Sequence, residues 1–373
     1  MSRTRYTRRL PAAAVVAGLA LALAACNSAE TGAGAAPTAA AEKLDPNADL
    51  SKQSLNITIW DGYSPEDLPK KVKDKFHFDV KVSIHDTNET AMAKLTATAD
   101  SGFDVAFVSG QYAQALSEQG LLEPLHHELI PNLSNLYPEA SELSYDKGNK
   151  FSVPYTWGTT GICYRSDLMK TKPTSWNDIL DPAPEYWKKY TLMTTERWMA
   201  LPALKALSFS INTTDDGQIA KAKELLVKAK QHFLAFDDTT FGDRLKTGEA
   251  VMVEAWDGWC PENEKNIEFV VPKEGSDLWA DTMVILKSSK NKEAAHAFIN
   301  YVLDPEIHSW LAENIFYKAP NKAAMEKVDP AVLEKFPSLK MTPAQLLQGE
   351  SIIDLGADAA KFTRLATEVA AQQ

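Results

Sequence analysis

Several motifs of catalytic and cofactor-binding proteins are missing from the 373-residue sequence. It contains no glycine-rich phosphate-binding loop and no Gly-x-Ser-x-Gly turn around a nucleophilic serine. His126 and His127 precede Glu128, but no second histidine follows at the spacing that zinc hydrolases use. We therefore expect neither a metal nor a cofactor, and no catalytic residues.

Positively charged residues are fewer than negatively charged ones, and cysteine is scarce. The formal net charge is -11 at pH 7, which argues against nucleic acid as a partner and favours cationic partners. Of the three cysteines, Cys26 lies near the N-terminus. The other two, Cys163 and Cys260, can form a disulfide in an oxidising compartment or stay free, and their distance in the sequence leaves both possibilities open.

Long apolar runs occur only near the N-terminus. Arginines precede an apolar run over 10–25 that is shorter than the roughly 20 residues of a membrane-spanning helix, so residues 1–25 are predicted to be a signal peptide. Small residues before Cys26 resemble the lipobox of bacterial lipoproteins, in which this cysteine is acylated. Residues 26–54 are predicted to comprise the lipidated cysteine and a flexible tether. The paired Arg8 and Arg9 leave general and twin-arginine export both open.

From about residue 55 the pattern is that of a folded protein that is longer than one hydrophobic core usually supports, so we expect two lobes. Strand-like and helix-like segments alternate, which predicts an α/β fold with a largely parallel sheet. Asn88 is expected to cap its helix. The predicted strands are 55–60, 78–84, 103–109, 250–255, 268–272 and 281–286, and the predicted helices are 66–76, 88–95, 112–119, 219–232, 292–303 and 305–315.

Aromatic and acidic residues gather next to the predicted strands. The four groups are 60–63, 109–112, 256–259 and 279–281. Ligands of open α/β sheets sit in the crevice at the carboxyl ends of strands. Aromatic faces attract cations and a carboxylate binds an ammonium group, so these groups predict a pocket for an amine.

Several segments of the chain follow the pattern of a known family: 61–65, 88–90 with 93–95, 132–136, 153–158, 271–275 and 290–293. They resemble the spermidine/putrescine-binding proteins of polyamine ABC importers. The resemblance extends from about residue 55 to 358.

The resemblance implies a type II periplasmic-binding-protein fold, with two hinge-connected lobes and a ligand cleft between them. We expect residues 55–158 and 282–320 in lobe 1, and residues 159–281 and 321–373 in lobe 2. It also implies an exported monomer on the outer face of the cytoplasmic membrane, in the periplasm or at the cell surface, with an ABC permease and its ATPase as partners.

Carried over residue by residue, the resemblance implies a ligand site with aromatic walls and one carboxylate. Asp281 matches the group that grips an ammonium, and Ser109 matches a polar contact. The full expected set is Trp60, Asp61, Tyr63, Ser109, Gln111, Trp198, Trp256, Asp257, Trp279 and Asp281.

The chain also departs from the family pattern. Thr195 and Trp198 stand where the family has an acidic pair for the other end of a polyamine, and Gln111 and Ile352 replace a tyrosine and a glutamine. Asp61, Glu196 or Asp257 are the candidates to supply the missing charge.

Three readings of the function remain open at this point. The first is a polyamine-binding protein, and its variant is the same transport role for a single-headed cation such as a quaternary ammonium or an amino acid derivative. The second is an extracellular hydrolase that uses paired carboxyls beside aromatic platforms to cleave sugars. The third is a sensor or adhesin on the same scaffold.

Overall fold

The computed structural model describes residues 43–371. The predicted signal peptide and Cys26 lie outside these residues. Within 43–371, no helix combines the length and the apolar character that crossing a membrane requires.

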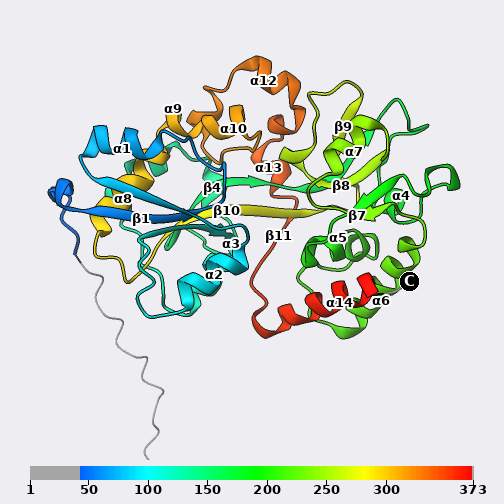
Figure 1. Cartoon of the computed structure of the whole chain (residues 1–373), viewed down its shortest axis with the longest axis horizontal. Helices are drawn as coiled ribbons and strands as arrows, with labels where there is room; N and C mark the ends of the chain where they lie inside the picture. Colours follow the sequence, from blue (N-terminus) through cyan, green and yellow to red (C-terminus); the bar gives the residue numbers. More distant parts are fainter. Residues whose placement is uncertain (1–42, 372–373) are drawn as a thin grey trace, which may run out of the picture. The chain divides into compact units, whose positions relative to one another are not determined.

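The described chain forms two mixed α/β units, each built on its own sheet, which we call the first and second lobes (Figure 1). The first sheet has the strand order β11-β10-β3-β1-β2 with β4 also paired to β10, and the second has the order β7-β6-β8-β5-β9. The first comprises β1 (Ser54–Ile59), β2 (Asp79–Ile84), β3 (Val105–Ser109), β4 (Ser152–Gly158), β10 (Asp277–Ile285) and β11 (Glu350–Ser351). The second comprises β5 (Thr160–Arg165), β6 (Tyr190–Leu192), β7 (Ala235–Phe236), β8 (Met252–Trp256) and β9 (Ile267–Val270).

Helices cover both faces of each sheet, as the alternation of buried residues requires. In β3, Val105 and Phe107 enter one core, whereas Ala106 and Val108 enter another. The helices of the first half are α1 (Leu68–Phe76), α2 (Asn88–Thr96), α3 (Gly110–Glu118), α4 (Asn177–Leu180), α5 (Glu196–Ala206) and α6 (Asp216–Lys230). Those of the second half are α7 (Phe241–Thr247), α8 (Lys292–Val302), α9 (Pro305–His308), α10 (Trp310–Asn314), α11 (Lys322–Met325), α12 (Pro330–Lys335), α13 (Pro343–Leu346) and α14 (Ala360–Ala371).

The predicted two-lobe α/β fold is confirmed, but the sheets are mixed rather than largely parallel. β1 runs parallel to β2 and β3, whereas β10 pairs antiparallel with β3 and β4. The second sheet likewise combines parallel and antiparallel pairs. Long connections through helices allow the parallel pairs, and the strands that return from the other lobe run the opposite way.

Two of the expected lobe boundaries were wrong. β10 begins at Asp277, inside the stretch assigned to lobe 2. From Trp279 onward it pairs with β4 of the first sheet. Met325, Phe336 and Leu339 pack in the first lobe's core, although 321–373 was assigned to lobe 2. Only the last part returns: α14 lies beside α5 and α6 (Figure 1). These boundaries depend on which core each segment buries its apolar side chains in. The spacing of residues in the sequence does not predict that choice.

Candidate ligand-binding site

Asp281 lies near the middle of β10, opposite Ser109 at the end of β3. Its Oδ2 accepts a hydrogen bond of 2.6 Å from the Tyr63 hydroxyl, and its Oδ1 accepts one of 2.6 Å from Ser109 Oγ. Burial raises the pKa of Asp281, and the two hydroxyl donors oppose that rise only in part. The carboxyl group is thus fixed in place but lacks a cationic partner among these contacts.

Asn88 positions this arrangement, but not as a helix cap. The cap of α2 is Thr87, whose side chain accepts from the Thr90 N–H. Asn88 instead donates to Ser109 Oγ at 2.9 Å and accepts from the Ser109 N–H at 3.0 Å. Ser109 can therefore donate its own hydroxyl hydrogen to Asp281.

An aromatic wall adjoins Asp281. The Tyr63 ring lies 5.2 Å from the Trp60 ring and 6.0 Å from the Tyr317 ring, measured between centroids. Tyr317 in turn lies 5.0 Å from Trp279. Tyr63 packs against the cores of both lobes, so this wall spans the junction between them.

Tyr317 is absent from the expected site, and it follows α10 in a stretch without a recognised motif. The residue before it, Phe316, has a φ of 60°. A left-handed backbone at a bulky residue is unusual and marks a position that its surroundings hold in place. The neighbouring Gly258 is equally constrained, because a Cβ there would lie 2.0 Å from Tyr317 Cδ1.

Asp281 lies in a strand, as predicted, whereas Trp279, which was expected to lie just before that strand, is also inside β10. Trp279 pairs with Gly158 of β4. A Cβ at Gly158 would come within 2.2 Å of Trp279 Cζ2 and 2.4 Å of Asp257 Oδ1. Trp279 Nε1 is buried and finds no hydrogen-bond acceptor within residues 43–371.

A second aromatic group belongs to the second lobe. The Trp256 ring lies 5.7 Å from Trp198 and 6.1 Å from Trp259. Trp198 Nε1 donates to Asp277 Oδ2 at 2.8 Å. Asp277 also accepts from Thr160 N–H and Oγ1, so both of its oxygens have partners.

Asp257 is buried in the turn directly after β8, where it contacts Thr159, the residue between β4 and β5. It accepts from the Gly258 N–H at 2.9 Å and from the Thr159 N–H at 3.4 Å. Burial raises its pKa to about 8. These contacts connect the turn after β8 to the segment in which the chain passes from the first sheet to the second.

The other expected residues are spread around these two groups. Asp61 is exposed in the turn after β1, and Gln111 is partly buried in the first turn of α3. Neither is hydrogen-bonded to Asp281 in the part of the chain that the structure describes. Thr195 Oγ1 donates to Asp238 at 3.1 Å, and Ile352 is buried in the second lobe's core.

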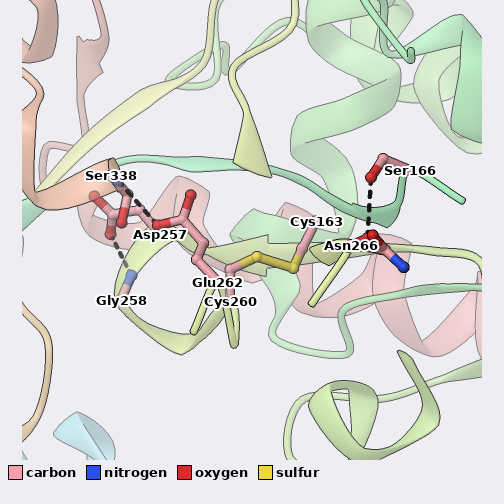
Figure 2. The surroundings of a disulfide bond; sticks show 8 residues. All are labelled: Cys163, Ser166, Asp257, Gly258, Cys260, Glu262, Asn266 and Ser338. Carbon is pink, nitrogen blue, oxygen red and sulfur yellow. Dashed lines mark hydrogen bonds between the residues drawn. A yellow bond between two sulfur atoms is a disulfide. The ribbon is translucent and has the colours of Figure 1, made fainter. Parts of the chain in front are cut away.

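Cys163 and Cys260 form a disulfide, with their Cα atoms 5.7 Å apart (Figure 2). Cys163 belongs to β5, and Cys260 directly follows the turn 257–259 that carries Asp257. Glu262, two residues further, accepts from the Ser338 N–H at 2.9 Å (Figure 2). Ser338 precedes a residue of the first lobe's core, so this segment links a strand of the second lobe to the first lobe.

No cluster of three or more histidine, cysteine, aspartate or glutamate side chains suited to a metal ion occurs within residues 43–371. The arrangement instead offers one carboxylate among aromatic rings. Such a site suits an organic cation, because the ring faces attract positive charge and the carboxylate accepts its hydrogen bonds.

Comparisons with known proteins agree with the fold and identify the family of the chain. The family described as bacterial extracellular solute-binding protein matches residues 68–338. The spermidine/putrescine-binding periplasmic protein of Salmonella typhimurium is 32% identical over 283 residues, which cover 75% of this chain and 81% of that protein. The putrescine/cadaverine-binding protein of Pseudomonas aeruginosa is 30% identical, with 80% and 85% covered.

Solved structures show the same likeness. A putative spermidine/putrescine ABC transporter from Listeria monocytogenes has a TM-score of 0.76 and 30% identity, with 86% of this chain and 99% of that chain covered. The spermidine/putrescine substrate-binding protein of Streptococcus pneumoniae has a TM-score of 0.75 and 28% identity, with 85% and 98% covered. The chain therefore belongs to the family of bacterial extracellular solute-binding proteins.

Proposed function

We propose that this chain captures a polyamine, such as putrescine or spermidine, and delivers it to the permease of an ABC importer. The observation that carries the proposal is Asp281, a carboxyl group held by two hydroxyls beside the rings of Tyr63, Trp279 and Tyr317. The names of the relatives support it, since they specify spermidine, putrescine and cadaverine.

The chemistry of the site explains the preference for an amine. Burial disfavours the charged carboxylate of Asp281, and a bound ammonium group would reverse that effect by direct Coulomb attraction. Each cation–ring contact adds about 0.5–2 kcal/mol, depending on how far water is excluded. Anions and neutral sugars gain neither contribution.

Residues from both lobes contribute to the site, which links binding to lobe closure. Asp281 and Ser109 belong to the first sheet, whereas Trp198 and Trp256 belong to the second lobe. A ligand that contacts both groups stabilises the closed arrangement over the open one. The permease recognises that closed form, and ATP hydrolysis belongs to the partner chains.

The proposal also includes where the protein acts relative to the membrane. Acylation of Cys26 would anchor the protein to the outer face of the cytoplasmic membrane, with residues 26–54 as the tether. The periplasmic relatives support an extracytoplasmic place. We infer a binding protein without enzymatic activity that acts as a monomer.

A single-headed cation is the second candidate ligand. Thr195 and Trp198 are uncharged where the family resemblance implies an acidic pair, and both oxygens of Asp277 are already hydrogen-bonded. This arrangement gives a second ammonium no evident partner at those two positions.

Calorimetric titration with putrescine, spermidine, choline and glycine betaine tests the proposal, using wild type, Asp281→Asn and Trp256→Ala. Removing one partner of a buried charge pair costs about 3–5 kcal/mol, so Asp281→Asn should weaken polyamine binding roughly 100-fold or more. The control is Asp74→Asn, which alters an exposed carboxylate paired with Lys70.

Loss of polyamine binding in both site variants, but not in the control, would support the proposal. Binding of only choline or glycine betaine would favour the single-headed cation. Failure of all four compounds to bind wild type would contradict the ligand class.

A further inference from the structure

Glu254 is a buried carboxyl group that the described site does not use. It lies in the middle of β8, on the face that it shares with Met252 and Trp256. The alternate residues Val253 and Ala255 face the opposite core, next to the disulfide. Glu254 is therefore directed to the same side of the second sheet as the aromatic residue Trp256.

The hydrogen bonding of Glu254 is incomplete. The residue is 0% exposed, its Oε2 accepts from the Met193 N–H at 2.9 Å, and its Oε1 has no partner among residues 43–371. Thr191 Oγ1, on the neighbouring strand β6, is also buried without a partner there. A buried acceptor without a partner has lost its hydrogen bonds to water and gained none in return, so this carboxyl group is a candidate to bind a ligand.

The electrostatic surroundings of Glu254 are acidic. Burial raises the pKa of Glu254 well above its usual value, and the charges of Asp238 and Asp277 add to that rise. Asp238 binds the Thr194 N–H at 2.6 Å, immediately after Met193 in the chain. The Arg197 guanidinium acts on Asp277, but among the described residues the charges that act on Glu254 itself are all negative.

The cluster adjoins the second aromatic group. Asp277 accepts the Trp198 indole N–H at 2.8 Å, and Trp198 stands edge-on to Trp256. Thr195 and Trp198, the two positions at which the family resemblance implies acidic residues, therefore border the Glu254 cluster directly.

We propose that Glu254 binds the second ammonium group of a two-headed amine, with Trp198 and Trp256 as the apolar walls along its carbon chain. The proposal rests on the proposed function and specifies its ligand class: a diamine or longer polyamine, with one end at Asp281 and the other at Glu254. The negative charge that Thr195 and Trp198 lack is supplied from strand β8 instead.

None of the three residues suggested by the sequence alone fits this role as well. Asp61 is exposed in a turn, and Asp257 already accepts two backbone N–H groups. Glu196 is partly exposed in the first turn of α5.

The test compares putrescine with butylamine, which has the same carbon chain and one ammonium group. Both are titrated into wild type, Glu254→Gln and the control Glu249→Gln, which removes an exposed carboxylate of the same lobe. A hydrogen bond to a charged group contributes about 1.5–3 kcal/mol. We therefore expect Glu254→Gln to weaken putrescine binding roughly 10- to 100-fold and to leave butylamine binding within about threefold of wild type.

A measurement on wild type alone provides a second readout. Titrations in buffers of different ionisation enthalpy report the protons released on binding. Burial favours the protonated form of Glu254, and an ammonium group bound beside it would favour the ionised form, so putrescine should release more protons than butylamine. If Glu254→Gln does not fold, this difference in proton release still tests whether Glu254 binds the second ammonium group. Equal release by the two amines would refute the inference.

Three further outcomes would overturn the inference. Equal weakening of both amines would make Glu254 a purely structural residue. Unchanged putrescine binding in Glu254→Gln, with wild type binding normally, would refute this inference and leave the proposed function standing. No amine binding to wild type would refute the proposed function and this inference together.

Discussion

The substitution Gly158→Ala tests whether the close packing at the hinge shapes the ligand site. A Cβ at this position would lie 2.2 Å from Trp279 Cζ2 and 2.4 Å from Asp257 Oδ1. Neither neighbour can retreat easily, because Trp279 lies in β10 between two paired strands and Asp257 is held by two N–H groups.

The expected losses of stability and of putrescine affinity follow from this packing. Adding a methyl group to a filled interior costs about 1–3 kcal/mol, and both contacts at Gly158 are shorter than real Cβ atoms show. We expect the free energy of unfolding to fall by about 2–3 kcal/mol. Displacement of Trp279 also disturbs its contact with Tyr317, so putrescine binding should weaken about tenfold, or roughly 1.4 kcal/mol.

Urea denaturation and calorimetric titration measure the two effects. Gly242→Ala is the matched control, because its Cβ would meet nothing closer than Pro261 Cγ at 3.8 Å and it lies within α7. Alanine in a helix should leave stability unchanged or raise it by about 0.4–1 kcal/mol. Wild-type stability and affinity in Gly158→Ala would refute the packing argument.

The remaining predictions concern the disulfide and a buried histidine. Replacing Cys163 and Cys260 by serine should lower the free energy of unfolding by about 2–5 kcal/mol, since the disulfide closes a loop with a sequence separation of 97; an unchanged urea midpoint would contradict this. His308 donates from Nε2 to the Tyr155 carbonyl at 2.7 Å, and burial lowers its pKa to about 4. Because the unfolded chain binds this proton at higher pH than the folded one does, stability should fall as pH drops from about 6.5 to 4, by about 3 kcal/mol. An NMR titration of His308 should show no protonation above about pH 5, and a midpoint near its ordinary value would refute the prediction.

Local patterns explain why much of the fold was predictable. Residues 105–109 are all buried, and their apolar run predicts a strand, whereas residues 54–57 alternate between exposed and buried positions. Helices such as α3 and α8 are recognisable from apolar spacing and from glycine or polar residues at their ends. Errors concentrate where distant segments meet: β10 begins four residues earlier than predicted because it pairs with β4 and β11 there.

The candidate site was predictable only in part. Trp60, Tyr63 and Trp256 stand out because exposed loops seldom carry such residues beside acids. Tyr317 and Glu254 carry no local signal: one follows a helix and the other sits within an apolar strand. Their significance depends on the rings and carboxyl groups that folding brings next to them.

The sequence by itself determined the chemistry of this protein: an acidic chain with alternating strands and helices, and with aromatic residues beside carboxylates. These properties depend on residue type and on short-range spacing, which the linear chain states directly. Only the tertiary structure decided which lobe residues 321–340 join, whether Cys163 and Cys260 pair, and which carboxyl groups lack partners. Those outcomes depend on contacts between segments that are far apart in the chain, where burial and close packing choose among arrangements that the local pattern leaves equivalent.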